Sequence, residues 1–162
     1  MIEPERWTVA ERYMVRYHLM HLVWIALAAI SLIIVAIGIV GALTAAAVLK
    51  SAPVSVTLWY AVFVLTPALS ATSFVVKDAI LRRVSSEWPL YQVVSAYKRA
   101  VAVTHAIGLI AGLIPVALAL WSGQFGYPLL VIIAPLGAMV YHFPHTDRFT
   151  TYAEHLAHGH AA

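Results

Sequence analysis

The sequence contains no cysteine and no asparagine, has only two glutamines, and is only 10% charged over 162 residues. Without cysteine, the chain has no disulfide, no thiolate ligand and no iron–sulfur cluster of its own. Soluble domains are about 25% charged, so this composition predicts a membrane protein. The scarcity of Asn, Gln and Cys also suits a thermophile, although helical membrane proteins are poor in amides anyway.

Three long stretches carry no formal charge: residues 17–49, 51–76 and 100–146. A membrane-spanning helix needs about 20 apolar residues. The first two stretches hold one span each, and the third holds two, because turn-forming residues interrupt it at 121–128. We therefore predict an all-α integral membrane four-helix bundle, a single membrane domain over residues 1–162. Its helices are expected at about 19–48, 55–77, 100–121 and 127–144, with a loop at 78–99 and a His-rich tail at 145–162.

Basic residues and histidines fall on one side of these predicted spans. Lys50 is the one exception among ten Lys and Arg residues, and all eight His lie on the basic side. The positive-inside rule therefore predicts a multi-pass protein of the cell membrane with both termini and the 78–99 loop in the cytoplasm. The pI near 9.3 reflects these basic residues beside the predicted spans and does not indicate nucleic-acid binding. The apolar run is too long for a signal peptide, so we expect every span to be kept.

The predicted loop at 78–99 has the composition of an interfacial segment. Trp88 and Tyr91 lie between the basic pairs at 82–83 and 98–99, which suits a segment at headgroup level. Pro89 breaks any single helix there. A solvated connector is the alternative interpretation.

Three histidines share one depth in the predicted spans. His21, His105 and His142 lie about 7–9 Å inside the cytoplasmic boundary, from the helical rise per residue. Ionisable groups inside a bilayer are costly and mark functional sites. His18 and His145 lie nearer the surface, where hydrogen bonding to a neighbour or a headgroup accounts for them. The same ordinary explanation stays open for the deeper three.

Two histidines on neighbouring helices can hold a haem iron, and helix bundles commonly bind cofactors in this way. Gly108 and Gly112 share the face of His105 and leave room for a porphyrin. Alternatively, they form a small-xxx-small motif for helix packing. His142 is a third candidate ligand, or a donor to a quinone carbonyl or a haem propionate.

The start of the chain resembles the membrane cytochrome b subunits of respiratory formate dehydrogenases and NiFe hydrogenases. The resemblance covers about forty residues and rests on Arg6-Trp7, Arg12, His18 or His21, and Gly38. It implies a four-helix electron-transfer subunit that passes electrons between a partner subunit and a quinone. It also implies haem b, with His21 and His105 as metal ligands, and Arg16 and Arg99 among the cations near its propionates.

Two departures from that family limit the expectation. Leu22 follows His21 where the family has Trp, and the second predicted helix has no His. At most one haem is therefore expected, near the cytoplasmic side.

Other functions remain open. The chain also fits a cofactor-free membrane anchor or accessory subunit of a larger respiratory complex. The spacing His142-x-x-His145 and the tail residues His155, His158 and His160 suggest a His-box membrane metalloenzyme or a metal-binding tail. A His-box enzyme needs more ligands than this chain offers. A channel or transporter lacks an obvious charged coupling site within the predicted spans.

Overall fold

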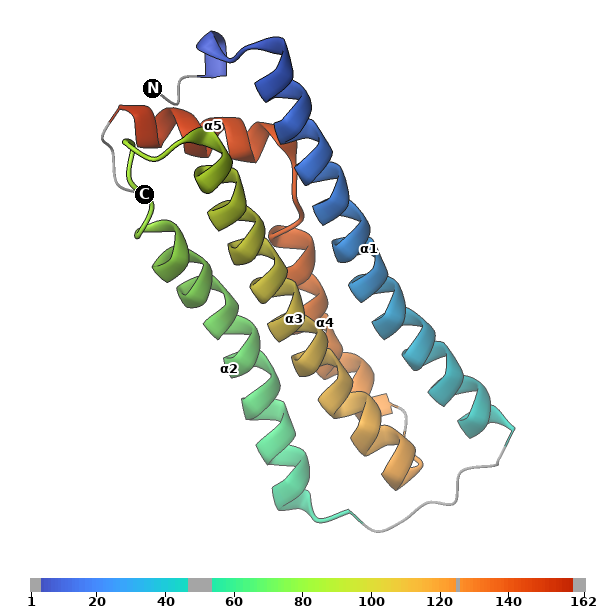
Figure 1. Cartoon of the computed structure of the whole chain (residues 1–162). Helices are drawn as coiled ribbons and strands as arrows, with labels where there is room; N and C mark the ends of the chain where they lie inside the picture. The colour runs from blue at the N-terminus through green and yellow to red at the C-terminus, as the bar shows by residue number, and fades with distance from the viewer. Residues whose placement is uncertain (1–3, 47–53, 125, 159–162) are drawn as a thin grey trace.

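The computed structural model describes residues 4–46, 54–124 and 126–158, and every regular element in those ranges is helical (Figure 1). Helices α1, α2 and α3 are each long and apolar enough to cross a membrane, and α4 is a shorter apolar helix. The elements are the 3-10 helix η1 (Pro4–Arg6), α1 (Val9–Ala45), α2 (Val56–Leu81), α3 (Leu90–Ser122), α4 (Gly126–Tyr141) and α5 (Thr146–Ala157).

Local sequence signals explain where the long helices begin and end. Thr8 caps α1: its hydroxyl accepts from the Glu11 backbone, and the Glu11 carboxylate accepts from the Thr8 backbone. Gly123 ends α3 in the left-handed region, with φ of 66°, where a residue without Cβ is favoured. The break predicted at 121–128 is confirmed, because α3 ends at Ser122 and α4 begins at Gly126.

Two segments differ from the sequence prediction. Helix α3 begins at Leu90 rather than near residue 100, so only residues 82–89 connect α2 to α3. Pro89 occupies the N-cap position of α3, where a missing N–H costs nothing. The predicted tail contains a twelve-residue helix, α5, because Phe149 and Ala153 give it an apolar face that packs on the other helices.

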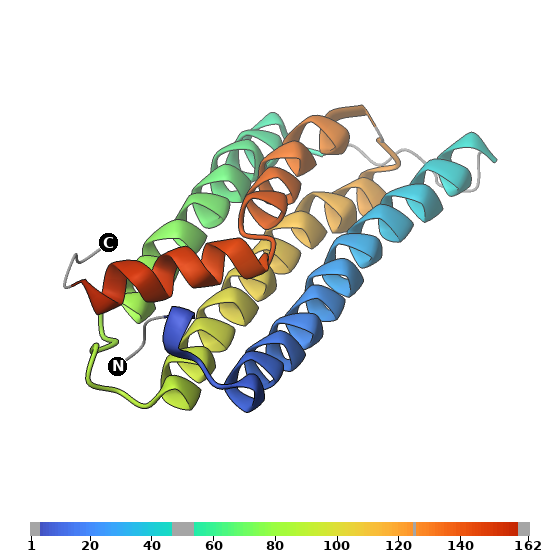
Figure 2. The ribbon, with the colours of Figure 1, turned by 90° about the horizontal axis from the view of Figure 1, so that it is seen from above.

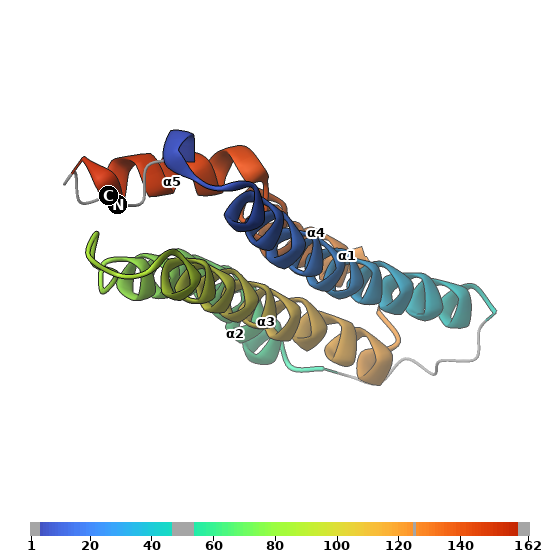
Figure 3. The ribbon, with the colours of Figure 1, turned by 45° about the horizontal axis from the view of Figure 1, so that its top comes forward.

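Helices α1 to α4 run side by side, with α3 between α1 and α2 (Figure 1). Figure 3 separates them into two layers, α1 with α4 and α2 with α3. Helix α3 packs against the other three, and about half of its most apolar stretch is buried. The corresponding stretches of α1 and α2 are mostly exposed, as expected of helices that face lipid.

Two glycines let α3 approach its neighbours closely. A Cβ atom added to Gly108 would lie 2.5 Å from Cγ of Met139 in α4. A Cβ added to Gly112 would lie 2.6 Å from Cδ1 of Ile33 in α1. Both neighbours are fully buried in one apolar cluster. The glycines therefore serve helix packing, the alternative that the sequence left open.

Helix α5 lies across one end of the other helices, which we call the α5 end (Figure 2). Phe149 is fully buried there, with ring centroids 5.1 Å from Tyr97 and 5.9 Å from Trp7. The Tyr152 hydroxyl donates to the Leu81 carbonyl at 3.2 Å. These contacts tie α5 to α2, to α3 and to Trp7, the residue after η1. All nine Lys and Arg of the described ranges lie on segments at this end; Lys50 is outside those ranges.

We expect Gly108→Leu to lower the free energy of unfolding by about 1–3 kcal/mol, because the new side chain overlaps Met139. The measurement is SDS-induced unfolding in mixed micelles. Gly38→Leu is the matched control, since nothing lies within 4 Å of a Cβ at that position. Equal stability of the two variants would contradict the packing described.

Burial raises the pKa of Tyr152 to about 12 from its ordinary 10.0. Below about pH 10 the tyrosine is protonated in both folded and unfolded chains, so its full contribution to stability is present there. Between about pH 10 and 12 the unfolded state loses the proton first, and the free energy of unfolding falls. Tyr152→Phe should reduce this fall in a pH series of Tm values. Tyr13→Phe, at an exposed residue, should not.

Candidate functional site

Helix α2 carries a polar stripe at Thr66, Ser70, Ser73 and Lys77. The spacings of four, three and four residues place these side chains on one face of the helix. The first three are buried, and the Ser70 and Ser73 hydroxyls donate to carbonyls one turn earlier. Thr72 lies at the same level of α2 as Ser70 and Ser73, but its side chain is exposed. The stripe therefore brings Lys77 to the inner side of α2.

Lys77 meets His142, the residue directly after α4. The Lys77 Nζ lies 3.4 Å from Nδ1 of His142, and only 3% of His142 is exposed. An ammonium group can only donate, so Nδ1 accepts and the imidazole proton is on Nε2. That Nε2 is buried and has no hydrogen-bond partner among the described residues. His142 thus offers a buried, unused donor.

His105 presents the opposite polarity. Its side chain is 1% exposed, and its Nδ1 lies 2.9 Å from the Val101 carbonyl. A carbonyl only accepts, so Nδ1 carries the proton and Nε2 keeps its lone pair. This Nε2 is also buried without a partner in the described ranges; the Met139 backbone lies close to the ring but outside hydrogen-bond geometry. His105 thus offers a buried, unused acceptor.

The contact between Gly108 and Met139 sets both histidines at one level. His105 precedes Gly108 by three residues and His142 follows Met139 by three, so each lies one turn closer to the α5 end. Lys77 contacts the His142 ring, and His105 lies at the same level on α3. We call these three side chains the Lys77–His105–His142 cluster. It combines a cation, a donor and an acceptor from three helices.

Aromatic side chains cover the cluster on its outer side. The Phe74 ring of α2 lies 4.3 Å from the His142 ring and 5.2 Å from the Tyr141 ring, between centroids. Phe74 and Tyr141 are both exposed on the surface that α2 and α4 present outward. These two rings thus lie between His142 and the outer surface of α2 and α4.

The other sequence-predicted site residues lie elsewhere. His21 is exposed on α1, and its Nε2 lies 3.1 Å from the Tyr17 hydroxyl of the same helix. Arg16 lines a pocket beside α5, and Arg99 lines a different pocket with Arg83 near the start of α3. The structure therefore brings His105 and His142 together, and leaves His21, Arg16 and Arg99 apart from them.

A haem held between His21 and His105 does not fit this packing. The Nδ1–H of His105 donates to a backbone carbonyl and leaves Nε2 free, which suits a metal ligand. His21, however, is exposed and hydrogen-bonded within its own helix. The face of Gly108 and Gly112, where a macrocycle would need room, is filled by Met139 and Ile33.

The histidines of the C-terminal region are spread along α5. His155 and His158 are exposed, and His158 contacts the Glu154 carbonyl through Nδ1 at 2.7 Å; His160 is outside the described ranges. Within those ranges, no three His, Asp or Glu side chains gather to hold a metal ion.

Lys77 is the residue that sequence reasoning missed. The charge pattern predicts a flank at the end of the second helix, whereas α2 continues to Leu81 and leaves the Lys77 side chain half-buried. The helical spacing of Thr66, Ser70, Ser73 and Lys77 is visible in the sequence and was the signal that could have identified it.

We expect Lys77→Met and His142→Leu to be energetically coupled. The double mutant should differ from the sum of the single mutants by about 0.5–3 kcal/mol in free energy of unfolding, because the two groups are in contact. Lys98→Met combined with His142→Leu is the control cycle and should be additive within about 0.5 kcal/mol. Additivity in both cycles would show that the lysine–histidine contact does not form.

Comparison with protein-family models, curated proteins and solved structures finds no match to this chain. Its function is accordingly argued from the chemistry of the Lys77–His105–His142 cluster and from the charge pattern of the helices.

Proposed function

We propose that this chain is a membrane subunit of a respiratory electron-transfer complex, and that its Lys77–His105–His142 cluster binds the headgroup of a quinone. The observation that carries the proposal is the pair of buried, unpartnered imidazole nitrogens, one a donor and one an acceptor. Leaving such groups unsatisfied costs about 1–3 kcal/mol each, so a ligand that satisfies both gains affinity.

The chemistry of a quinone headgroup matches the two nitrogens. Its carbonyl oxygen accepts from Nε2–H of His142, and the hydroxyl of its reduced form donates to Nε2 of His105. Reduction to the quinol takes up two electrons, which come from a partner subunit, and two protons, one from Nε2 of His142 and one from water at the α5 end. Lys77 stabilises negative charge beside His142 and can replace the proton that the imidazole gives up.

The position of the cluster also supports a lipid-soluble ligand. It lies behind Phe74 and Tyr141, which face the apolar surroundings. A quinone reaches the cluster from the bilayer between α2 and α4 when these rings rotate. Ligand sites that combine an apolar lining with a few converging polar groups are the common pattern for small molecules.

The proposed topology is a four-helix membrane bundle, with α4 as the fourth span and both termini in the cytoplasm. Nine of ten Lys and Arg residues on one side support this orientation. The cluster then lies toward the cytoplasmic side, where a soluble electron-donating or electron-accepting partner docks. The resemblance of the first forty residues to respiratory cytochrome b subunits supports the same assignment. Because the packing does not fit a haem between His21 and His105, the proposal places no haem on that pair.

A second candidate is a cofactor-free accessory subunit of such a complex. The broad apolar face of α1 favours it, because Trp24, Ile34 and Val35 are more than half exposed and offer a surface to another membrane subunit as readily as to lipid. Under this alternative, the chain co-purifies with partners but retains no quinone.

The proposal is tested on the full chain in nanodiscs with decylubiquinone as the probe. We expect saturable binding, weakened roughly ten-fold or more by His142→Leu, because the quinone carbonyl loses a buried hydrogen bond. His105→Leu should weaken by a similar factor the binding of decylubiquinol, whose hydroxyl donates to Nε2 of His105. His21→Leu is the matched control and should bind like the wild type.

An optical spectrum of the same preparation distinguishes the alternatives. A reducible haem b band that disappears in His21→Ala would overturn the proposal in favour of the haem interpretation. Quinone binding that is unaffected by all the cluster variants, or no binding at all, would leave the accessory subunit as the better assignment.

A further inference from the structure

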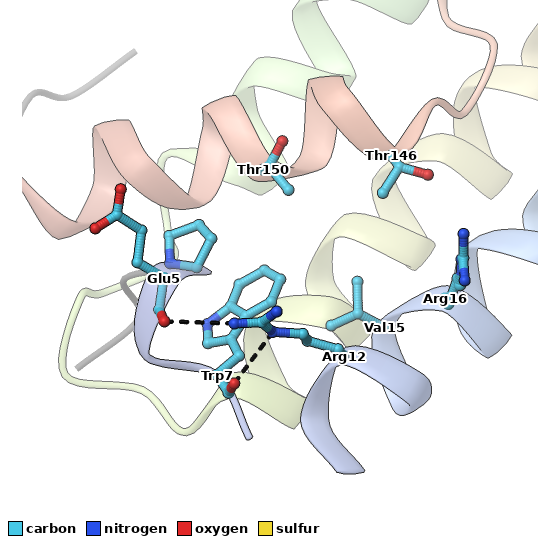
Figure 4. Close-up of a pocket in the computed structure, with 8 residues that line it drawn as sticks. Glu5, Trp7, Arg12, Val15, Arg16, Thr146 and Thr150 are labelled. Carbon is cyan, nitrogen blue, oxygen red and sulfur yellow. Dashed lines mark hydrogen bonds between the residues drawn. The ribbon is translucent and has the colours of Figure 1, made fainter. Parts of the chain in front are cut away.

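A pocket of about 490 Å³ opens between the start of α1 and α5, on the α5 end of the molecule. Figure 4 shows its walls: η1 and α1 supply one side, and α5 supplies the other. Its volume falls in the range of about 300–1,000 Å³ that small-molecule sites occupy. The lining residues are Pro4, Glu5, Trp7, Arg12, Val15, Arg16, Thr146 and Thr150.

Two arginines give the pocket its positive charge, and they differ in their hydrogen bonds to the rest of the protein. The Arg12 guanidinium donates to the Trp7 carbonyl at 3.2 Å and the Glu5 carbonyl at 3.5 Å, which holds η1 in place. Arg16 has no hydrogen bond or ion pair with any described residue, and it extends toward Thr146 of α5 (Figure 4). The Glu5 carboxylate lies at the opposite end of the pocket from Arg16.

The inner rim of the pocket lies where the chain enters the apolar layer. Arg16 directly precedes the charge-free stretch 17–49, and Thr146 closes the charge-free stretch 100–146. Val15 and the Trp7 ring, both buried, form an apolar wall between these polar groups. Phosphate groups of lipids lie at this depth, and basic pockets between membrane helices bind anionic headgroups.

We propose that this pocket binds a phosphate group, supplied by the headgroup of an anionic lipid. The Arg16 guanidinium pairs with two phosphate oxygens, the Thr146 hydroxyl donates to one of them, and Arg12 contributes a second positive charge from the pocket wall. The apolar wall of Trp7 and Val15 accommodates the glycerol and the first carbons of the acyl chains. The bound lipid bridges α1 and α5. Soluble phosphate is the other source of the same chemistry.

The test measures binding to the purified full chain in detergent by native mass spectrometry, with three probes: phosphatidylglycerol, phosphatidylcholine and inorganic phosphate. We expect phosphatidylglycerol to bind the wild type most tightly. Arg16→Gln should weaken that binding roughly ten-fold, because a charge-assisted bidentate contact is lost. Arg82→Gln is the matched control: it removes one charge from the same end, and Arg82 does not line the pocket. It should bind as tightly as the wild type.

A second variant separates the proposed site from a change in folding. Thr146→Val preserves side-chain shape and net charge, and Thr146 is exposed, so folding should be unaffected while phosphatidylglycerol binding weakens. Arg12→Gln is avoided because Arg12 holds η1. Equal losses in Arg16→Gln and Arg82→Gln, or equal binding of phosphatidylcholine, would overturn the proposal. Inorganic phosphate binding as tightly as the lipid would retain the phosphate site and overturn the lipid as its source.

Discussion

The close approach of α3 to α1 and α4 is the constraint on which the rest of the structure depends. In lipid there is little hydrophobic gain from bringing apolar helices together, so packing and hydrogen bonds must hold them. Gly112 and Gly108 allow Ile33 and Met139 to reach the α3 backbone, and these contacts fix the rotation of α3. That rotation turns His105 toward α4 and places it at the level of His142.

Because α3 is closely packed, the hydrogen-bond partners of the buried polar groups near it can be compared one by one. Around the cluster most buried groups are satisfied within their own helices, as Ser70, Ser73 and Thr104 are. The Thr66 hydroxyl and His18 Nδ1 are exceptions, and so are the two imidazoles, each of which has one nitrogen committed to a protein partner and the other unused. A stable bundle has no need of such exceptions. A matched donor and acceptor on facing helices is most simply explained by a ligand with both polarities.

The sequence predicted the long apolar helices, but not which way their side chains face. Charge-free stretches and Gly123 located the long helices and the break before α4. Depth alone grouped His21 with His105, although the two point to different environments, because helix rotation depends on packing partners far away in the chain. Lys77 illustrates a related limit. A charged residue near the end of an apolar helix is interpreted as the boundary of a membrane span unless the polar residues on the same face of that helix are considered. The sequence did not predict α5, because the apolar face of this helix consists of only two or three residues.

The position of α5 has a consequence for the order of folding. Its buried face contacts residues of η1, α2 and α3, so its docking surface exists only after those helices have inserted and assembled. Earlier spans can enter the bilayer independently as separate helices. The docking of α5 therefore depends on the arrangement of the preceding helices, whose residues form the surface that α5 buries.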